Sequence, residues 1–129
     1  MKVIFKPGDE KHYRKIVQAE DVASFHGKVV HPVCSTFALA REIEWTTRLF
    51  VMDMRDDDEE GVGTFLTIEH KGPAFVGEEI VFTGVVESIK GHELICKFHA
   101  QVGSRTIAVG KTGQKILRRE KIEQLFKPS

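Results

Sequence analysis

Three residues of this chain, Thr36, Glu44 and His70, have side chains that could carry out acid–base or nucleophilic chemistry. A carboxylate and an imidazole can move protons, and a positioned hydroxyl can donate a hydrogen bond or be activated as a nucleophile. On one helix, Glu44 would lie about 80° around the axis from Thr36 and about 12 Å along it. Thr36 must then bend back from the preceding loop or face a substrate that lies between the two residues.

Taken one at a time, these residues also have ordinary structural interpretations. A glutamate on a helix is most often a solvated charge, and a histidine at the edge of a core often bonds a backbone carbonyl. Spacing alone does not bring Thr36, Glu44 and His70 into one site. The residues by themselves therefore leave the function open.

A long helix is predicted from Ser35 or Thr36 to about Met54. Apolar residues at Leu39, Ile43 and Phe50 recur near helical spacing. A hydroxyl residue directly before this run is a typical N-cap, because its oxygen accepts from an otherwise unpaired backbone N–H. Thr36 is therefore expected at the entrance of the helix.

The chain after the helix alternates with the period of β-strands. Residues 62–70 place Val62, Thr64, Leu66, Ile68 and His70 on one strand face, which is the expected core face. Further strands are expected at 79–88, 92–102 and 106–117, joined by turns at Lys90-Gly91 and Gly103-Ser104. An antiparallel sheet covering one long helix predicts the α+β class. Residues 1–22 favour a strand only weakly, 24–33 a loop, and 119–126 a short helix.

Length and charge limit the possible partners. A chain of 129 residues fits a single domain, expected to span 1–129. Nineteen Lys and Arg balance nineteen Asp and Glu, so no positive field favours nucleic acid. Charged residues interrupt every apolar stretch, which argues against a membrane span or a signal peptide. We expect a cytoplasmic protein.

Metal chemistry is not indicated by the sequence. Cys34 and Cys96 are far apart, with no Cys-x-x-Cys pattern, so we expect two reduced thiols. The six histidines are scattered and form no pair at helical spacing. We expect neither a metal ion nor another cofactor.

Four short motifs follow one another in the chain: Val33-Cys34-Ser35-Thr36, Glu44-Trp45, Gly61-Val62-Gly63-Thr64 and Ile68-Glu69-His70. In this order and spacing they resemble the fluoroacetyl-CoA thioesterase-like family of hotdog proteins. The resemblance extends from about Gly27 to Leu117 and implies a hotdog fold, with about five antiparallel strands wrapped around one central helix.

The resemblance also implies an activity, the hydrolysis of a small acyl-CoA thioester. Glu44 would be the nucleophile or general base, His70 would assist proton transfer, and Thr36 would donate a hydrogen bond or help to activate the nucleophile. Gly63 would allow its backbone to approach the substrate, because glycine has no side chain. Lys115 is the candidate for a basic substrate-binding residue on the last strand.

Departures from the family pattern narrow what the resemblance implies. Phe37 stands where the family often has Pro, and residues 27–33 contain no aromatic side chain that could crowd a small acyl group. Fluoroacetyl specificity is therefore not implied. We expect a homodimer, because a sheet with exposed edges needs covering.

Two other functions remain open. One is a non-catalytic hotdog module that binds an acyl-CoA or a related thioester, and a buried Glu44 without an ionic partner would argue against it. The other is a hydratase or dehydratase of the same fold, but His31-Pro32 is not preceded by the Gly-Asp that such enzymes show.

Overall fold

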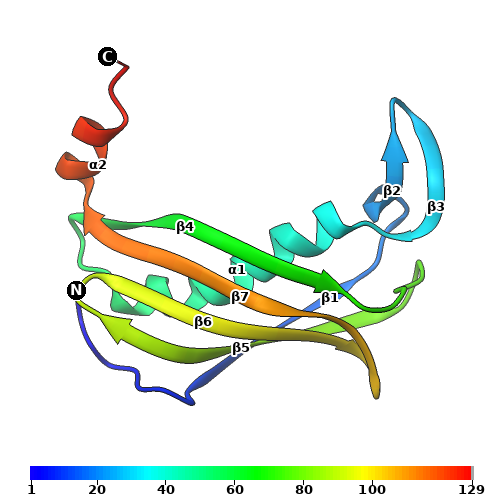
Figure 1. Cartoon of the computed structure of the whole chain (residues 1–129), viewed down its shortest axis with the longest axis horizontal. Helices are drawn as coiled ribbons and strands as arrows, with labels where there is room; N and C mark the ends of the chain where they lie inside the picture. Colours follow the sequence, from blue (N-terminus) through cyan, green and yellow to red (C-terminus); the bar gives the residue numbers. More distant parts are fainter. Residues whose placement is uncertain (129) are drawn as a thin grey trace.

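The computed structural model describes residues 1–128 and consists of one antiparallel sheet, one long helix and two smaller attachments (Figure 1). The elements in chain order are β1 (Glu10–Ile16), η1 (Ala19–Asp21), β2 (Val22–Phe25), β3 (Lys28–Cys34), α1 (Thr36–Met54), β4 (Glu59–His70), β5 (Glu79–Lys90), β6 (Glu93–Val102), β7 (Arg105–Arg118) and α2 (Arg119–Leu125). The predicted α+β class and the predicted elements after residue 36 are confirmed.

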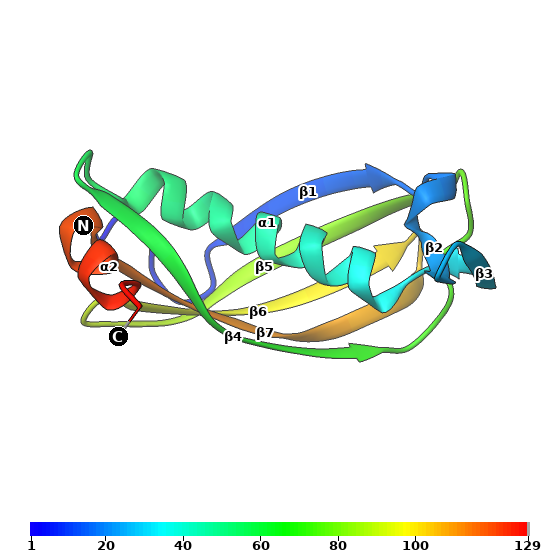
Figure 2. The same cartoon turned by 90° about the horizontal axis from the view of Figure 1, so that it is seen from above.

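The five-stranded sheet has the order β1-β5-β6-β7-β4 and curves around α1 (Figure 2). The apolar face of α1 fills the concave side of the sheet, where Leu39, Ile43 and Phe50 are fully buried. Burying a side chain of this size stabilises the folded state by about 1.5–3 kcal/mol. The sheet ends at β4 on one side, so β4 presents an unpaired edge.

The start of α1 is fixed by Ser35, which occupies the N-cap position. Its side-chain oxygen accepts a hydrogen bond of 3.0 Å from the backbone N–H of Ala38. Thr36 is the first helical residue, so its hydroxyl is not needed for capping. The sequence left the cap between these two residues, and the structure assigns it to Ser35.

A β-bulge interrupts β4 at Thr64. Gly63 pairs with Gln114 and Phe65 with Gly113, which leaves Thr64 without a partner residue. Beyond the bulge, Leu66 and His70 are half-buried on the helix side, as predicted. Before the bulge, the odd-numbered residues face the helix instead of the even-numbered ones. Gly61 shows this, because a Cβ on it would lie 2.7 Å from the Val51 side chain of α1. The predicted inward positions of Val62 and Thr64 are therefore wrong: Val62 is half-buried on the other face, and Thr64 is exposed.

The predicted loop at residues 24–33 is also wrong, since β2 and β3 pair there as a hairpin. The turn is made by His26 and Gly27, whose φ angles are 52° and 78°. Two consecutive positive φ angles suit the twist of a tight hairpin. Exposed residues fill most of β3, so no alternation marked it in the sequence.

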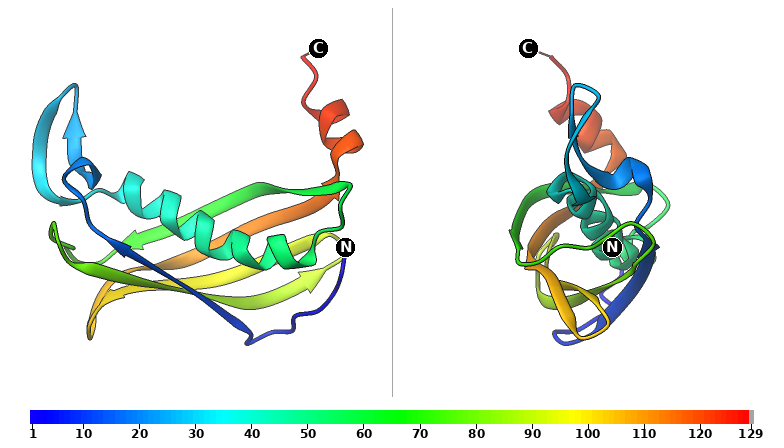
Figure 3. Two further views of the ribbon diagram at one scale, coloured as in Figure 1. Left: turned by 180° about the vertical axis from the view of Figure 1, so that it is seen from behind. Right: turned by 90° about the vertical axis from the view of Figure 1, so that its right-hand side faces the viewer.

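The hairpin and α2 extend from the two ends of the molecule, on the same side (Figures 1 and 3). Phe25 and Val29 on the hairpin and Leu125 and Phe126 at the end of α2 are all more than half exposed. Within residues 1–128, no helix is long and apolar enough to cross a bilayer. The same residues contain no group of three or more His, Cys, Asp or Glu that could hold a metal ion.

The division of roles between Ser35 and Thr36 predicts different effects on stability. Ser35→Ala should lower the free energy of unfolding by about 1 kcal/mol, because the Ala38 N–H loses its partner. Thr36→Val should change it by less than about 0.5 kcal/mol, as expected for an exposed side chain away from a cap. Urea denaturation of both variants measures the difference. A larger loss for Thr36→Val would contradict the assignment of the cap.

Candidate active site

Thr36 and His70 form a hydrogen-bonded pair where the start of α1 meets the end of β4. Thr36 Oγ1 lies 3.0 Å from His70 Nδ1. The hydroxyl is exposed and the imidazole is half-buried. A threonine O–H that donates to a neutral imidazole is arranged for transfer of its proton, so the pair can activate either the hydroxyl itself or a bound water.

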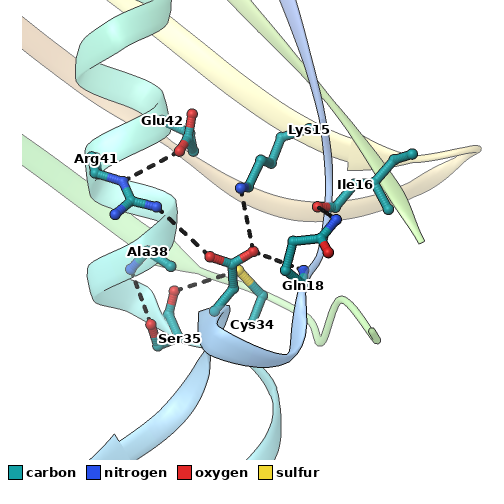
Figure 4. A network of polar contacts seen from close by, with 9 residues as sticks. Lys15, Ile16, Gln18, Cys34, Ser35, Ala38, Arg41 and Glu42 are labelled. Atoms are coloured by element: carbon teal, nitrogen blue, oxygen red, sulfur yellow. Dashed lines mark hydrogen bonds and ion pairs between the residues drawn. The ribbon is translucent and has the colours of Figure 1, made fainter. Parts of the chain in front are cut away.

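A buried carboxylate, Asp21, holds this end of α1 in place. Figure 4 shows Lys15 and Arg41, the two cations that contact it. The Asp21 side chain is 3% exposed, with Lys15 Nζ at 3.5 Å and Arg41 Nη2 at 3.7 Å. It also accepts a hydrogen bond from the backbone N–H of Gln18, and its own carbonyl accepts from the N–H of Ser35. Because two cations and a backbone donor surround Asp21, it is a structural group that positions the residue before Thr36.

Cys34 lies beside this network but is not a nucleophile. Burial, followed by the charge of Asp21, raises the pKa of the Cys34 thiol to about 11. Burial also raises the pKa of Cys96 to about 12. Both residues are unpaired and buried, which agrees with the predicted reduced thiols, and both are thiols rather than thiolates near neutral pH.

Glu44 faces a separate cavity of about 300 Å³ between the middle of α1 and the junction of β4 with β7. Gly63 lies directly opposite, and a Cβ on it would be 4.0 Å from Glu44 Oε1. The other lining residues come from α1 (Arg41, Trp45, Thr47, Arg48), β4 (Gly61, Phe65) and β7 (Thr112, Gly113, Gln114). The cavity thus places a carboxylate opposite two glycines, Gly61 and Gly63, which have no side chains.

Neither arginine at the cavity neutralises Glu44. Arg48 Nη2 bonds Glu60 Oε1 at 2.8 Å, while Arg41 contacts Asp21 and Glu42. Among the described residues, the Glu44 carboxylate has no hydrogen bond or ion pair, so it is free to act on a ligand. The Glu44 side chain is exposed in the single chain, so burial of this carboxylate does not argue against a non-catalytic module.

The two parts of the candidate site are well separated within one chain. Glu44 is about 12 Å from Thr36 along the helix axis. His70 is seven residues beyond Gly63, roughly 20 Å along the bulged strand. A single carbonyl group cannot contact the Thr36–His70 pair and the Glu44–Gly63 cavity of the same chain at once.

Lys115 lies on the outer face of β7. It is exposed, pairs with Val62 and Glu93, and is not among the residues that line the cavity. Its neighbour Gln114 is buried and faces the cavity instead. Sequence reasoning missed Gln114 and Thr112, although the alternation of β7 with buried Ile116 places both on its inner face. A substrate-binding role for Lys115 stays a prediction.

The sequence model of the fluoroacetyl-CoA-specific thioesterase family, FlK, matches residues 17–120. The chain belongs to this family. The match covers α1 and every strand of the sheet except β1, and it includes both parts of the candidate site. The sequence matches none of the curated proteins.

Solved structures show the same fold. A thioesterase superfamily member from Thermus thermophilus is 27% identical with a TM-score of 0.89, over 94% of this chain and 90% of that one. A variant of the fluoroacetyl-CoA-specific thioesterase FlK is 18% identical with a TM-score of 0.87, over 96% of each chain. A hot-dog-like protein from Thermanaerovibrio acidaminovorans is 17% identical with a TM-score of 0.84, over 97% and 96%. The hotdog fold is therefore established.

Gly63→Ala should separate the chemical role of Gly63 from its structural role. The added methyl has no neighbour closer than Glu44 Oε1, so the free energy of unfolding should change by less than about 1 kcal/mol. The methyl would occupy space between Glu44 and a ligand, so ligand turnover or binding should fall at least about tenfold. Calorimetric melts and ligand assays on the same preparations test this, and full retention of both would remove Gly63 from the site.

Proposed function

We propose that this protein is an acyl-CoA thioesterase that hydrolyses a small acyl thioester. The observation that carries the proposal is the coexistence of a hydrogen-bonded Thr36–His70 pair and an unpaired Glu44 carboxylate facing a cavity. The family supports the same activity. Structures of FlK variants have been determined with fluoroacetate and CoA and with acetyl-CoA.

The chemistry follows from the electrophilic carbonyl of a thioester. Glu44 acts as the nucleophile or as the general base that takes a proton from water. The Thr36–His70 pair transfers a proton. It donates a hydrogen bond to the developing oxyanion or a proton to the departing sulfur, which leaves as the thiol. The backbone beside Gly63 is accessible to the carbonyl oxygen of the thioester. Backbone N–H groups there can stabilise the negative charge that develops on this oxygen.

We further propose that the working form is a homodimer in which one chain supplies Thr36 and His70 and the other supplies Glu44 and Gly63. The unpaired edge of β4 offers backbone groups for a second copy. A two-fold axis between Leu66 and Thr67 would place His70 of one copy beside Gly63 of the other. This arrangement removes the separation of roughly 20 Å that divides the two parts in a single chain.

The alternative is a non-catalytic module that binds an acyl-CoA. The exposure of Glu44 in the single chain favours it, since an exposed carboxylate costs little to retain. Turnover of short acyl-CoA thioesters, followed with a thiol reagent, distinguishes the two functions. Tight binding without thiol release would establish the module.

Glu44→Gln should lower kcat by a factor of about 10² or more, because the amide keeps the shape but loses the basic and nucleophilic oxygen. KM should change far less, and the free energy of unfolding should stay within about 0.5 kcal/mol, since the carboxylate is exposed and unpaired. Glu42→Gln is the matched control. Glu42 lies on the same helix, contacts Arg41 and is absent from the cavity lining, so kcat should be unchanged. Wild-type kcat in Glu44→Gln would rule out this mechanism.

Mixing two inactive variants tests the shared site. Random re-association of Thr36→Val and Glu44→Gln chains should restore up to about one quarter of wild-type activity, because half of the dimers are mixed and each has one intact site. Thr36→Val and His70→Ala alter the same part of the site, so their mixture should restore nothing. Recovery in neither mixture, or a light-scattering mass of about one chain, would contradict the shared site while leaving the thioesterase activity to be judged from the single variants.

A further inference from the structure

One residue in the wall of the cavity beside Glu44, Thr112, has a buried hydroxyl without a partner among residues 1–128. Thr112 lies on the inner face of β7, paired with Leu66 of β4 and Cys96 of β6. Its residue is 2% exposed, and Oγ1 forms no hydrogen bond within the described part of the chain. Buried hydroxyls are normally paired, because leaving one unpaired costs the hydration that it loses on folding.

A second polar group lies next to this hydroxyl. Gln114 is 8% exposed, and its Nε2 donates to Thr47 Oγ1 over 3.3 Å, which is long for a hydrogen bond. The Thr47 hydroxyl in turn lies 3.4 Å from the carbonyl oxygens of Ile43 and Glu44. Thr112 and Gln114 thus belong to the same cavity wall, and both retain hydrogen-bonding capacity, since Thr112 Oγ1 has no partner in the described chain and Gln114 makes one long bond.

The charges around the cavity restrict what this wall can recognise. Arg48 is bonded to Glu60, and Arg41 lies close to Asp21 and Glu42, so the positive charge of both arginines is largely compensated. A carboxylate on the ligand would lie close to the Glu44 carboxylate, with no uncompensated cation beside it to offset the repulsion. The wall therefore suits a neutral oxygen rather than an anion.

We propose that the acyl group of the substrate carries a neutral oxygen substituent, a hydroxyl or a keto group close to the thioester, and that Thr112 and Gln114 bind it. This inference rests on the proposed thioesterase function and specifies its substrate class. A cavity of about 300 Å³ is at the small end of ligand sites, which limits the acyl group to a short chain. The Trp45 and Phe65 side chains line the same cavity and contact the carbon atoms.

Pairs of thioesters with matched shape test the proposal. The ratio of kcat/KM for glycolyl-CoA over propionyl-CoA, and for 3-hydroxybutyryl-CoA over 3-methylbutyryl-CoA, should reach about tenfold or more for at least one pair. Acetoacetyl-CoA should behave like the hydroxyacyl partner if a keto oxygen is accepted. Equal rates within both pairs would overturn the proposal and leave the thioesterase function intact, and so would a preference for malonyl- or succinyl-CoA.

The variant Thr112→Val keeps the shape and removes the hydroxyl. It should bring the ratio of kcat/KM for the preferred pair of thioesters close to one. Thr112→Ser should keep most of the preference for the hydroxyacyl thioester. Thr46→Val is the matched control, because Thr46 is fully buried, bonds the carbonyl of Glu42 and does not line the cavity. Its ratio should equal that of the wild type. An unchanged ratio in Thr112→Val would overturn the role of Thr112.

Binding separates this inference from the hydrolytic activity. CoA thioethers with a hydroxyalkyl or a matching alkyl group cannot be hydrolysed, so their Kd values report recognition alone. The wild-type protein should bind the hydroxyalkyl thioether about tenfold more tightly, and Thr112→Val should bind both alike. Such a preference would support the polar pocket even if no thioester were turned over, and equal Kd values in the wild type would overturn it.

Discussion

The close packing of β4 against both α1 and β7 is the constraint on which the site depends. A Cβ on Gly61 would overlap the Val51 side chain, and one on Gly113 would overlap the Phe65 ring and the Thr64 hydroxyl. The absence of a side chain at Gly61 lets β4 lie against α1, and its absence at Gly113 lets β4 lie against β7. The cavity beside Glu44 is bounded by the same segment, so the residues that allow the packing also define the ligand space.

The bulge at Thr64 adds a second geometric condition. His70 lies seven positions after Gly63 in the sequence. Because side chains alternate along a regular strand, two residues an odd number of positions apart would face opposite sides of the sheet. One extra residue in β4 corrects the parity, and both positions then face the helix side of the sheet. The Gly-Val-Gly-Thr sequence therefore supplies close packing and the change of face within four residues.

Much of this architecture could be predicted from the sequence, and the exceptions have physical causes. The periodicity of Leu39, Ile43 and Phe50 marked α1, and the alternation after residue 79 marked the remaining sheet. The hairpin of β2 and β3 was missed because exposed strands need no alternation. The bulge was missed because it is a property of the pairing between β4 and β7, and the alternation within one strand does not show how that strand pairs. The motif residues could be named from the resemblance. Their separation into a Thr36–His70 pair at the end of β4 and a Glu44–Gly63 cavity near its start could not be predicted, because it depends on how α1 packs against the strand.

The helix cap and the reactive hydroxyl belong to different residues, Ser35 and Thr36, and this separation affects how such a site can change during evolution. A hydroxyl at the N-cap of a helix bonds the backbone, so replacing it lowers the stability of the helix. Here neighbouring residues carry these tasks, because Ser35 bonds the helix backbone and Thr36 bonds His70. Position 36 can therefore accept a different reactive group without loss of the helix start, which leaves this corner of the fold open to new reactions.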